Sequence, residues 1–140
     1  NPATYNAIYD LATQILDPLI EYFGGIELTY GFSSAELSAH IPARIAPRAD
    51  QHACCELKRN GLPISPRLGA SCDFIVKNES MFEVAEWILE NLPFDRLYIY
   101  DDTLPIHVSC GPENTRAAFI MKTAASAKLH PSRWSKRAVG

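Results

Sequence analysis

The stretch "RLYIYDDTLPIHVSCG", residues 96–111, decides the fold, because it carries two strand patterns with a turn between them. Alternating apolar and polar residues flank the turn, which predicts a short antiparallel hairpin. The alternation places His107 and Ser109 on one face of the second strand and Ile106 and Val108 on the other. Since isoleucine and valine suit the core, we expect His107 to point to the opposite face, where a cleft would lie.

His107 has two interpretations that the hairpin alone leaves open. Asp101 and Asp102 are either turn formers beside a half-exposed strand histidine, or acids beside a metal ligand. Asp73 favours the metal, because it lies near the start of the apolar strand pattern "CDFIVK" and an unpaired buried carboxylate is very costly. With His107 and one more histidine, Asp73 would complete a three-ligand zinc site whose fourth position stays open for water.

The remaining patterns alternate between helix and strand, which predicts an α+β fold: a mainly antiparallel sheet with helices packed on one face. Apolar spacing and capping signals predict these elements in order: a helix over 2–23 bent at Pro18 and stopped by Gly24-Gly25, a strand over 26–32, a loop over 33–50, a short helix over 50–61, and a helix over 80–92 that begins with the capping box Ser80 and Glu83.

The composition is that of one ordinary globular domain, with 140 residues, 21% of them charged, and a net charge of -3. We expect a single domain over residues 1–125 and a basic C-terminal tail over 126–140. No acidic residue follows Glu113, and a solvated tail explains this bias; a tail that contacts nucleic acid or another chain, with Trp134, is the alternative. Otherwise the small net charge argues against nucleic-acid binding, and no apolar run approaches the ~20 residues of a membrane span.

The four cysteines form neither a disulfide framework nor a C-x-x-C metal pattern; they are Cys54, Cys55, Cys72 and Cys110. Free thiols in a reducing compartment are therefore expected, which favours a cytoplasmic location. No signal peptide is visible, although the start at Asn1 rather than methionine indicates a trimmed chain. Cys72 should lie in the core, and no thiol-protease motif surrounds Cys110.

Three segments together resemble one known family. They are "LATQILDPLIEYFGGIELTYGFSS" (11–34), "GASCDFIV" (69–76) and "LYIYDDTLPIHVS" (97–109). In that order they are similar to the opening helix and first strand, the G-x-A-x-D segment and the closing hairpin of the zinc D-alanyl-D-alanine carboxypeptidases and related peptidoglycan endopeptidases. These enzymes share their fold with the hedgehog signalling domain, so the resemblance implies a hedgehog/DD-peptidase-like fold over most of the chain.

The resemblance implies that Asp73 and His107 are zinc ligands. The family motif S-x-H-x-x-G-x-A-x-D has its first histidine seven residues before the aspartate, where this chain has Pro66. His52, in "DQH", restores the match if "ACCELKRNGLPIS" (53–65) is an insertion, which costs little chain entropy when its ends stay close together. His40 is the alternative third ligand.

Catalytic residues are also implied by the resemblance. Asp101 falls where related enzymes place the acidic general base, with Asp102 as the alternative. The arginine that stabilises the oxyanion or binds substrate in these enzymes is replaced by Ser33 in "TYGFSS". Arg48 would take its role, the other candidates being Arg44 and Arg67.

The expected function is therefore that of a zinc metallopeptidase, a hydrolase of a peptide or amide bond that acts on a peptide-like substrate such as a peptidoglycan stem. Zinc would activate water and polarise the scissile carbonyl, and an aspartate would accept the water's proton. The alternative is a non-catalytic binding module of the same fold, with or without zinc. The Ser33 substitution and the inserted segment favour the module, whereas the retained acids and His107 favour the enzyme.

Overall fold

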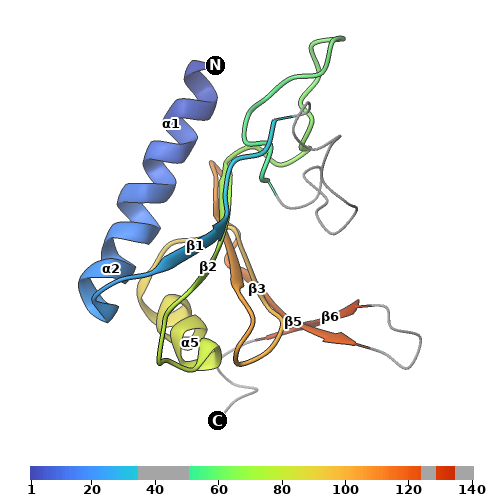
Figure 1. Cartoon of the computed structure of the whole chain (residues 1–140). Coiled ribbons are helices and arrows are strands. Elements are labelled where there is room, and N and C mark those ends of the chain that lie inside the picture. Colours follow the sequence, from blue (N-terminus) through green and yellow to red (C-terminus); the bar gives the residue numbers. More distant parts are fainter. Residues whose placement is uncertain (35–50, 124–128, 135–140) are drawn as a thin grey trace.

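The structure is a computed structural model that describes residues 1–34, 51–123 and 129–134. Its elements follow in the order α1 (Pro2–Leu11), a π-helical turn η1 (Ala12–Leu16), α2 (Asp17–Phe23), β1 (Glu27–Tyr30), β2 (Ala70–Ile75), α5 (Met81–Asn91), β3 (Arg96–Ile99), β4 (Ile106–Cys110), β5 (Ala117–Thr123) and β6 (Leu129–Arg133). The six strands form a sheet in the order β1-β2-β4-β3-β5-β6, antiparallel except for the parallel pair β3 and β5 (Figure 1). The predicted α+β class is confirmed, with a mixed sheet in which antiparallel pairs dominate.

The N-terminal helical segment changes its winding where Pro18 enters it. Asn1 caps α1 by accepting a hydrogen bond at Oδ1 from the Ala3 N–H at 3.0 Å, and Pro2 stands in the first turn, where no N–H is needed. Pro18 cannot donate a helical hydrogen bond, and the chain widens into the η1 turn immediately before it. Gly24, at φ 89°, ends α2 in the left-handed conformation, as the sequence predicts.

The turn between β3 and β4 is attached to the start of α5. Ser80 caps this helix by accepting a hydrogen bond from the Glu83 N–H at 3.4 Å, and its hydroxyl donates to the Asp102 carboxylate. The Met81 N–H donates to the Asp102 carbonyl at 3.0 Å. The hairpin and the helix therefore hold each other in place, and Asp102 is the residue that joins them.

The described helices pack on one face of the sheet, and this face is the hydrophobic core (Figure 1). In the adjacent strands β2 and β4, the core-facing residues are Cys72, Phe74, Ile106 and Val108, and each is at most 2% exposed. Burial of large aliphatic or aromatic side chains contributes about 1.5–3 kcal/mol each. His107, between two of them, faces the opposite side of the sheet, as strand alternation predicts. No helix in the described part is long and apolar enough to cross a membrane.

The face opposite the helices carries one row of side chains in register across five strands. The Cα pairs are Tyr30 with Asp73, Asp73 with His107, His107 with Tyr98, and Tyr98 with Phe119. We call these five residues the cross-strand row. Because neighbouring strands are about 4.8 Å apart, the row places side by side residues that are distant in the sequence.

The segment after residue 50 is irregular, so the short helix predicted over 50–61 is wrong for its described part, 51–61. Gln51 and Cys54 adopt φ values of 63° and 53°, in the left-handed region, which interrupts helical hydrogen bonding. Further on, the Lys58 N–H donates to the Leu62 carbonyl at 2.7 Å and closes a turn. Local backbone geometry thus overrides the capping and spacing signals of this segment.

The predicted division into a domain over 1–125 and a solvated tail over 126–140 does not describe residues 129–134. These residues contain β6, which pairs antiparallel with β5 and extends the sheet. Trp134 is 5% exposed within the core, and its backbone N–H donates to the Ala118 carbonyl at 2.8 Å. The burial of a large indole ring outweighs the basic charge bias that suggested a tail, and Trp134 is not available to contact nucleic acid.

Candidate metal site

Asp73 and His107 meet because β2 and β4 are adjacent antiparallel strands. Their Cα atoms are register partners, and both side chains face away from the helices. The Nδ1 atom of His107 lies 2.9 Å from Oδ1 of Asp73. The two residues that the sequence suggests as metal ligands, from separate motifs, are therefore neighbours in space.

His52 reaches the same carboxylate from the loop that precedes β2. Its Nε2 atom lies 3.3 Å from Oδ1 of Asp73. Two contacts hold this loop: the Ser33 N–H donates to the His52 carbonyl at 2.9 Å, and the Gln51 side chain donates to the Leu68 carbonyl at 3.0 Å. These contacts keep His52 beside β2, although residues 53–65 separate the two in the sequence.

Together His52, Asp73 and His107 could hold a metal ion, since one ligand atom from each lies within 4.8 Å of the others. We call these residues the metal triad. The two histidines are 1% and 2% exposed, whereas the Asp73 side chain is 26% exposed. The carboxylate is therefore the part of the triad that is most accessible to solvent.

Hydrogen bonding determines which ring nitrogen of His52 carries the proton and which one directs a lone pair at the Asp73 carboxylate. The Nδ1 atom of His52 lies 2.8 Å from the Gly31 carbonyl oxygen, which only accepts, so Nδ1 carries a proton. In the neutral ring Nε2 then has no proton and points a lone pair at the Asp73 oxygen 3.3 Å away. Two acceptors at this distance repel each other unless a second proton or a cation lies between them. A carbonyl bonded to the remote nitrogen is also the usual support of a metal-binding imidazole.

The Asp73 carboxyl is held in its ionised form. Burial alone would raise its pKa, but when the two imidazoles are protonated, their hydrogen bonds and positive charge outweigh burial and lower the pKa from 3.8 to about 2. The triad thus presents an anionic oxygen between two imidazoles at any pH near neutrality, which is the donor set that a divalent cation needs.

One pair of ligand atoms in the triad already has the spacing of a tetrahedral zinc site. Bonds of about 2.0–2.2 Å at tetrahedral angles place two ligand atoms about 3.3–3.6 Å apart. The separation of His52 Nε2 and Asp73 Oδ1, 3.3 Å, already falls in this range. The 2.9 Å contact of His107 is a hydrogen-bond distance and would widen by about 0.4–0.7 Å on metal binding. Three protein ligands leave a fourth position open.

Two tyrosines of the cross-strand row orient the imidazoles. Tyr98 stacks on His107 with ring centroids 4.9 Å apart and planes at 16°, and Tyr30 meets His52 edge-on at 4.5 Å. The Tyr30 hydroxyl and Nε2 of His107 are buried and have no hydrogen-bond partner among the described residues. Packing against the two tyrosines therefore fixes the imidazole rings, while the Tyr30 hydroxyl and Nε2 of His107 remain available for hydrogen bonds.

The residues predicted to act in catalysis do not join the triad as a group. Asp102 is bound to the start of α5, as described above. Asp101 is exposed and accepts a hydrogen bond from the Asp102 N–H at 2.7 Å, in the turn that leads to His107. Arg48 and the alternative ligand His40 lie outside the described residues. Asp101 therefore stays a prediction, and so does Arg48.

The other polar residues considered from the sequence have contacts of their own. Nε of Arg67 lies 3.8 Å from Oδ2 of the buried Asp95, which makes this arginine part of an ion pair. The Ser109 hydroxyl accepts a hydrogen bond from the backbone N–H of Arg96 at 3.0 Å and so supports the pairing of β3 with β4. Ser33 is fully buried. Arg44 lies outside the described residues.

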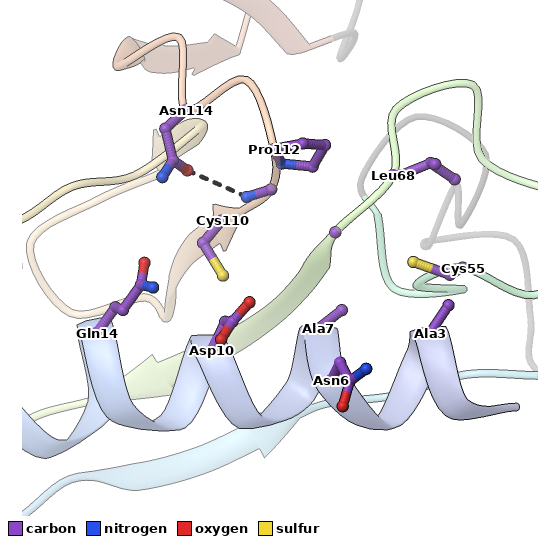
Figure 2. Close-up of a pocket in the computed structure, with 12 residues that line it drawn as sticks. Ala3, Asn6, Ala7, Asp10, Gln14, Cys55, Leu68, Cys110, Pro112 and Asn114 are labelled. Carbon is purple, nitrogen blue, oxygen red and sulfur yellow. Dashed lines mark hydrogen bonds between the residues drawn. The ribbon is translucent and has the colours of Figure 1, made fainter.

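A separate hollow of about 380 Å³ lies between α1 and the ends of β2 and β4, and no triad residue lines it (Figure 2). Asn6 and Asp10 of α1 and Gln14 of η1 lie along one side of it, and Cys110 lies on the side of the sheet. Burial raises the pKa of the Cys110 thiol to about 12, so this cysteine is not a nucleophile at neutral pH. The four cysteines are free thiols, as predicted.

Sequence reasoning missed Tyr30 and Gly31 as neighbours of the metal triad and gave Arg96 no role. Tyr30 stands in a strand pattern, but its pairing with Asp73 depends on a register shift between Leu28 and Tyr30 that no local signal announces. Alternation places Arg96 two residues before Tyr98 on the same face of β3, but only its neighbours across the sheet distinguish it from an ordinary strand arginine.

Comparison of the chain with known protein families, with curated proteins and with solved structures gives no match. The case for a function therefore rests on the geometry of the site.

Proposed function

We propose that the chain is a zinc-dependent hydrolase of peptide or amide bonds, with a divergent hedgehog/DD-peptidase-like architecture. One observation carries the proposal: ligand atoms of two buried imidazoles and one carboxylate converge within 4.8 Å of one another. Two nitrogens and one oxygen, with a fourth position left open, are the donor set of catalytic zinc sites.

The donor set favours zinc over the common alternatives. Calcium and magnesium take mostly oxygen ligands, and six or more of them, whereas the metal triad offers two nitrogens. Among the described residues no cysteine belongs to the group, which argues against a closed structural zinc site. When bound, zinc would supply Lewis acidity and a water of lowered pKa.

The residues of the chain would divide the remaining work. His52, Asp73 and His107 hold the metal, and the Gly31 carbonyl keeps Nε2 of His52 turned toward it. Asp101 accepts the proton of the attacking water and passes it to the leaving amine. The Tyr30 hydroxyl, buried beside His52, is a hydrogen-bond donor for a substrate oxygen.

Asp101→Asn is expected to lower kcat about 10²- to 10⁴-fold without lowering the zinc content, because the variant loses only the proton acceptor. Amine release from acetylated peptides ending in D-Ala-D-Ala or in L-residues measures the rate, and elemental analysis measures the metal. Asp102→Asn is the matched control, since asparagine still accepts the Ser80 hydrogen bond, and its rate should stay within a few-fold of the wild type.

A non-catalytic zinc-binding module is the second candidate, and Ser33 is the observation in its favour, because it stands where the resembling enzymes carry an arginine. Zinc bound to the wild type with no hydrolysis of any peptide in the panel would establish the module and refute the hydrolase. Equal rates for the wild type and Asp101→Asn would remove Asp101 from the mechanism while leaving the hydrolase in place.

Zinc binding between pH 5 and 6 is expected to release at most two protons per ion. The Asp73 carboxyl has a pKa of about 2 and is already ionised there, so only the two imidazoles can lose protons to the solvent. Affinity should therefore fall as the pH is lowered, because protons compete for the histidine nitrogens. Calorimetry in buffers of different ionisation enthalpy counts the protons, and a count above two would require a further titrating ligand.

A further inference from the structure

Arg96 lies on the same face of the sheet as the metal triad. In β3 it alternates with the buried Leu97 and therefore shares a face with Tyr98, which stacks on His107. Its backbone N–H donates to the hydroxyl of Ser109, the next residue after His107 on that face of β4. Arg96 thus lies two residues along β3 from Tyr98, beside the cross-strand row and on the same face of the sheet.

The Arg96 guanidinium is turned toward the outer part of the row. Its central carbon lies 5.9 Å from the centroid of the Phe119 ring, and Phe119 in turn lies 5.8 Å from Tyr98, centroid to centroid. A guanidinium over an aromatic face is held by cation–π attraction, which leaves its N–H donors at the edge free to bind a planar anion. Tyr98 and Phe119 therefore form an aromatic surface between the metal triad and a fixed positive charge.

The Arg96 guanidinium forms no ion pair within the described part of the chain, and its charge acts at longer range on Asp95, whose pKa it helps to lower. Nε of Arg96 is buried and has no hydrogen-bond partner there. The described ion pairs join Asp73 to the two histidines, Asp95 to Arg67, and Glu27 to Lys77, and none includes Arg96. The neighbouring Asp95 is already engaged, since it also accepts hydrogen bonds from the N–H and the hydroxyl of Thr115.

We propose that Arg96, with Tyr98 and Phe119, forms a substrate subsite that binds a carboxylate. This rests on the proposed hydrolase function and names its substrate class: a peptide with a carboxylate two to three residues from the bond that faces the metal. Phe119 lies two strands from His107, on the order of 10 Å at about 4.8 Å per strand. An extended peptide spans this distance with two to three residues at about 3.3–3.6 Å each.

Two chemical groups could supply this carboxylate, the C-terminus of a peptide or the side chain of an internal acidic residue. Three probes distinguish them: acetyl-Ala-Ala-Ala with a free C-terminus, its C-terminal amide, and acetyl-Ala-Ala-Glu amide. Binding is measured by titration of the full chain as purified, with the zinc content determined on the same samples. The wild type should bind at least one carboxylate probe about 10- to 100-fold more tightly than the uncharged amide, because hydrogen bonds between charged groups are the strong ones.

Arg96→Met keeps an unbranched apolar stem over Phe119 and removes the charge, so it should bring the carboxylate-to-amide affinity ratio to about one. Arg96→Lys should restore part of the preference, which a merely structural role would not predict. In the wild type, the Arg96 Nε–H resonance should shift on adding a carboxylate probe and stay in place with the amide. This measurement holds even if a variant fails to fold.

Equal affinity of the wild type for all three probes, or an unchanged ratio in Arg96→Met, would overturn the subsite. Zinc binding without a carboxylate preference removes the subsite and leaves the proposed metal function intact. A carboxylate preference in a chain that binds no zinc removes the proposed metal function and leaves the subsite intact. Failure of the subsite is therefore distinguishable from failure of the metal function.

Discussion

Replacing Asp73 by alanine is expected to weaken zinc binding about 100- to 1000-fold. Structural zinc sites with four ligands have binding free energies of about 10–16 kcal/mol, so one ligand accounts for about 2.5–4 kcal/mol. This corresponds to about two to three powers of ten in the dissociation constant. Asp73 is the residue on which both histidines converge, and its removal leaves two buried imidazoles without the anion that orients them. His52→Ala and His107→Ala should each show losses of the same order.

The measurement is a competition titration with a chromogenic zinc chelator, performed on folded protein. Asp95→Asn is the matched control, because Asp95 is also buried but pairs with Thr115 and Arg67 rather than with the triad. Its zinc affinity should equal that of the wild type. If Asp73→Ala binds zinc as tightly as Asp95→Asn does, the metal is held elsewhere in the chain.

Gly69→Ala is expected to lower the free energy of unfolding by about 3–5 kcal/mol, the largest effect on stability that the structure predicts. A Cβ at Gly69 would lie 2.0 Å from the Cys110 carbonyl oxygen and 2.9 Å from Cα of Gly111. These atoms belong to backbone and cannot rotate away. Gly69 also has a φ of 137°, a conformation that alanine strongly disfavours.

Gly25→Ala provides the control for this prediction. No atom lies within 4 Å of a Cβ built at Gly25, and its φ is outside the left-handed region, so the free energy of unfolding should change by less than about 1 kcal/mol. Urea denaturation measures both variants. A loss below about 1 kcal/mol in Gly69→Ala would show that β2 and β4 do not approach each other as closely as the structure indicates.

Gly69 also connects stability to the metal triad. It stands directly before β2, whose first residue, Ala70, pairs with Cys110 of β4. Three residues further along the same ladder, Asp73 pairs with His107. Displacing β2 from β4 at this end would therefore move the two ligand atoms apart, so Gly69→Ala should weaken zinc binding as well.

Local signals in the sequence were sufficient for much of the fold. Strand alternation placed Cys72 in the core and His107 on the opposite face, and a capping box located the start of α5 at Ser80. The hairpin of β3 and β4 followed from a single short turn. These elements depend on residues close together in the chain, which is the range over which spacing and capping act.

Elements that depend on distant partners could not be obtained this way. β5 pairs in parallel with β3, an arrangement set by tertiary packing, and β6 contains the polar sequence "LHPSR" (129–133), which has no strand alternation. The irregular segment at 51–61 depends on left-handed residues such as Gln51, a conformation that no local signal in the sequence predicts.

The candidate site shows the same division between local and distant information. Asp73 was singled out by a local argument, an acid within an apolar strand, and His107 by alternation. Their meeting follows from the pairing of β2 with β4, and the arrival of His52 follows from a loop whose path no spacing rule predicts. Arg96 was overlooked because a charged residue near the start of a strand is ordinary unless its neighbours across the sheet are known.

The most direct test of the account is a crystal structure of the zinc-soaked chain with anomalous scattering measured on both sides of the zinc edge. The account predicts one anomalous peak about 2.0–2.2 Å from Nε2 of His52, Oδ1 of Asp73 and Nδ1 of His107, with a fourth position open to water. A zinc peak bound by other residues, or none while His107 still contacts Asp73 directly, would contradict it.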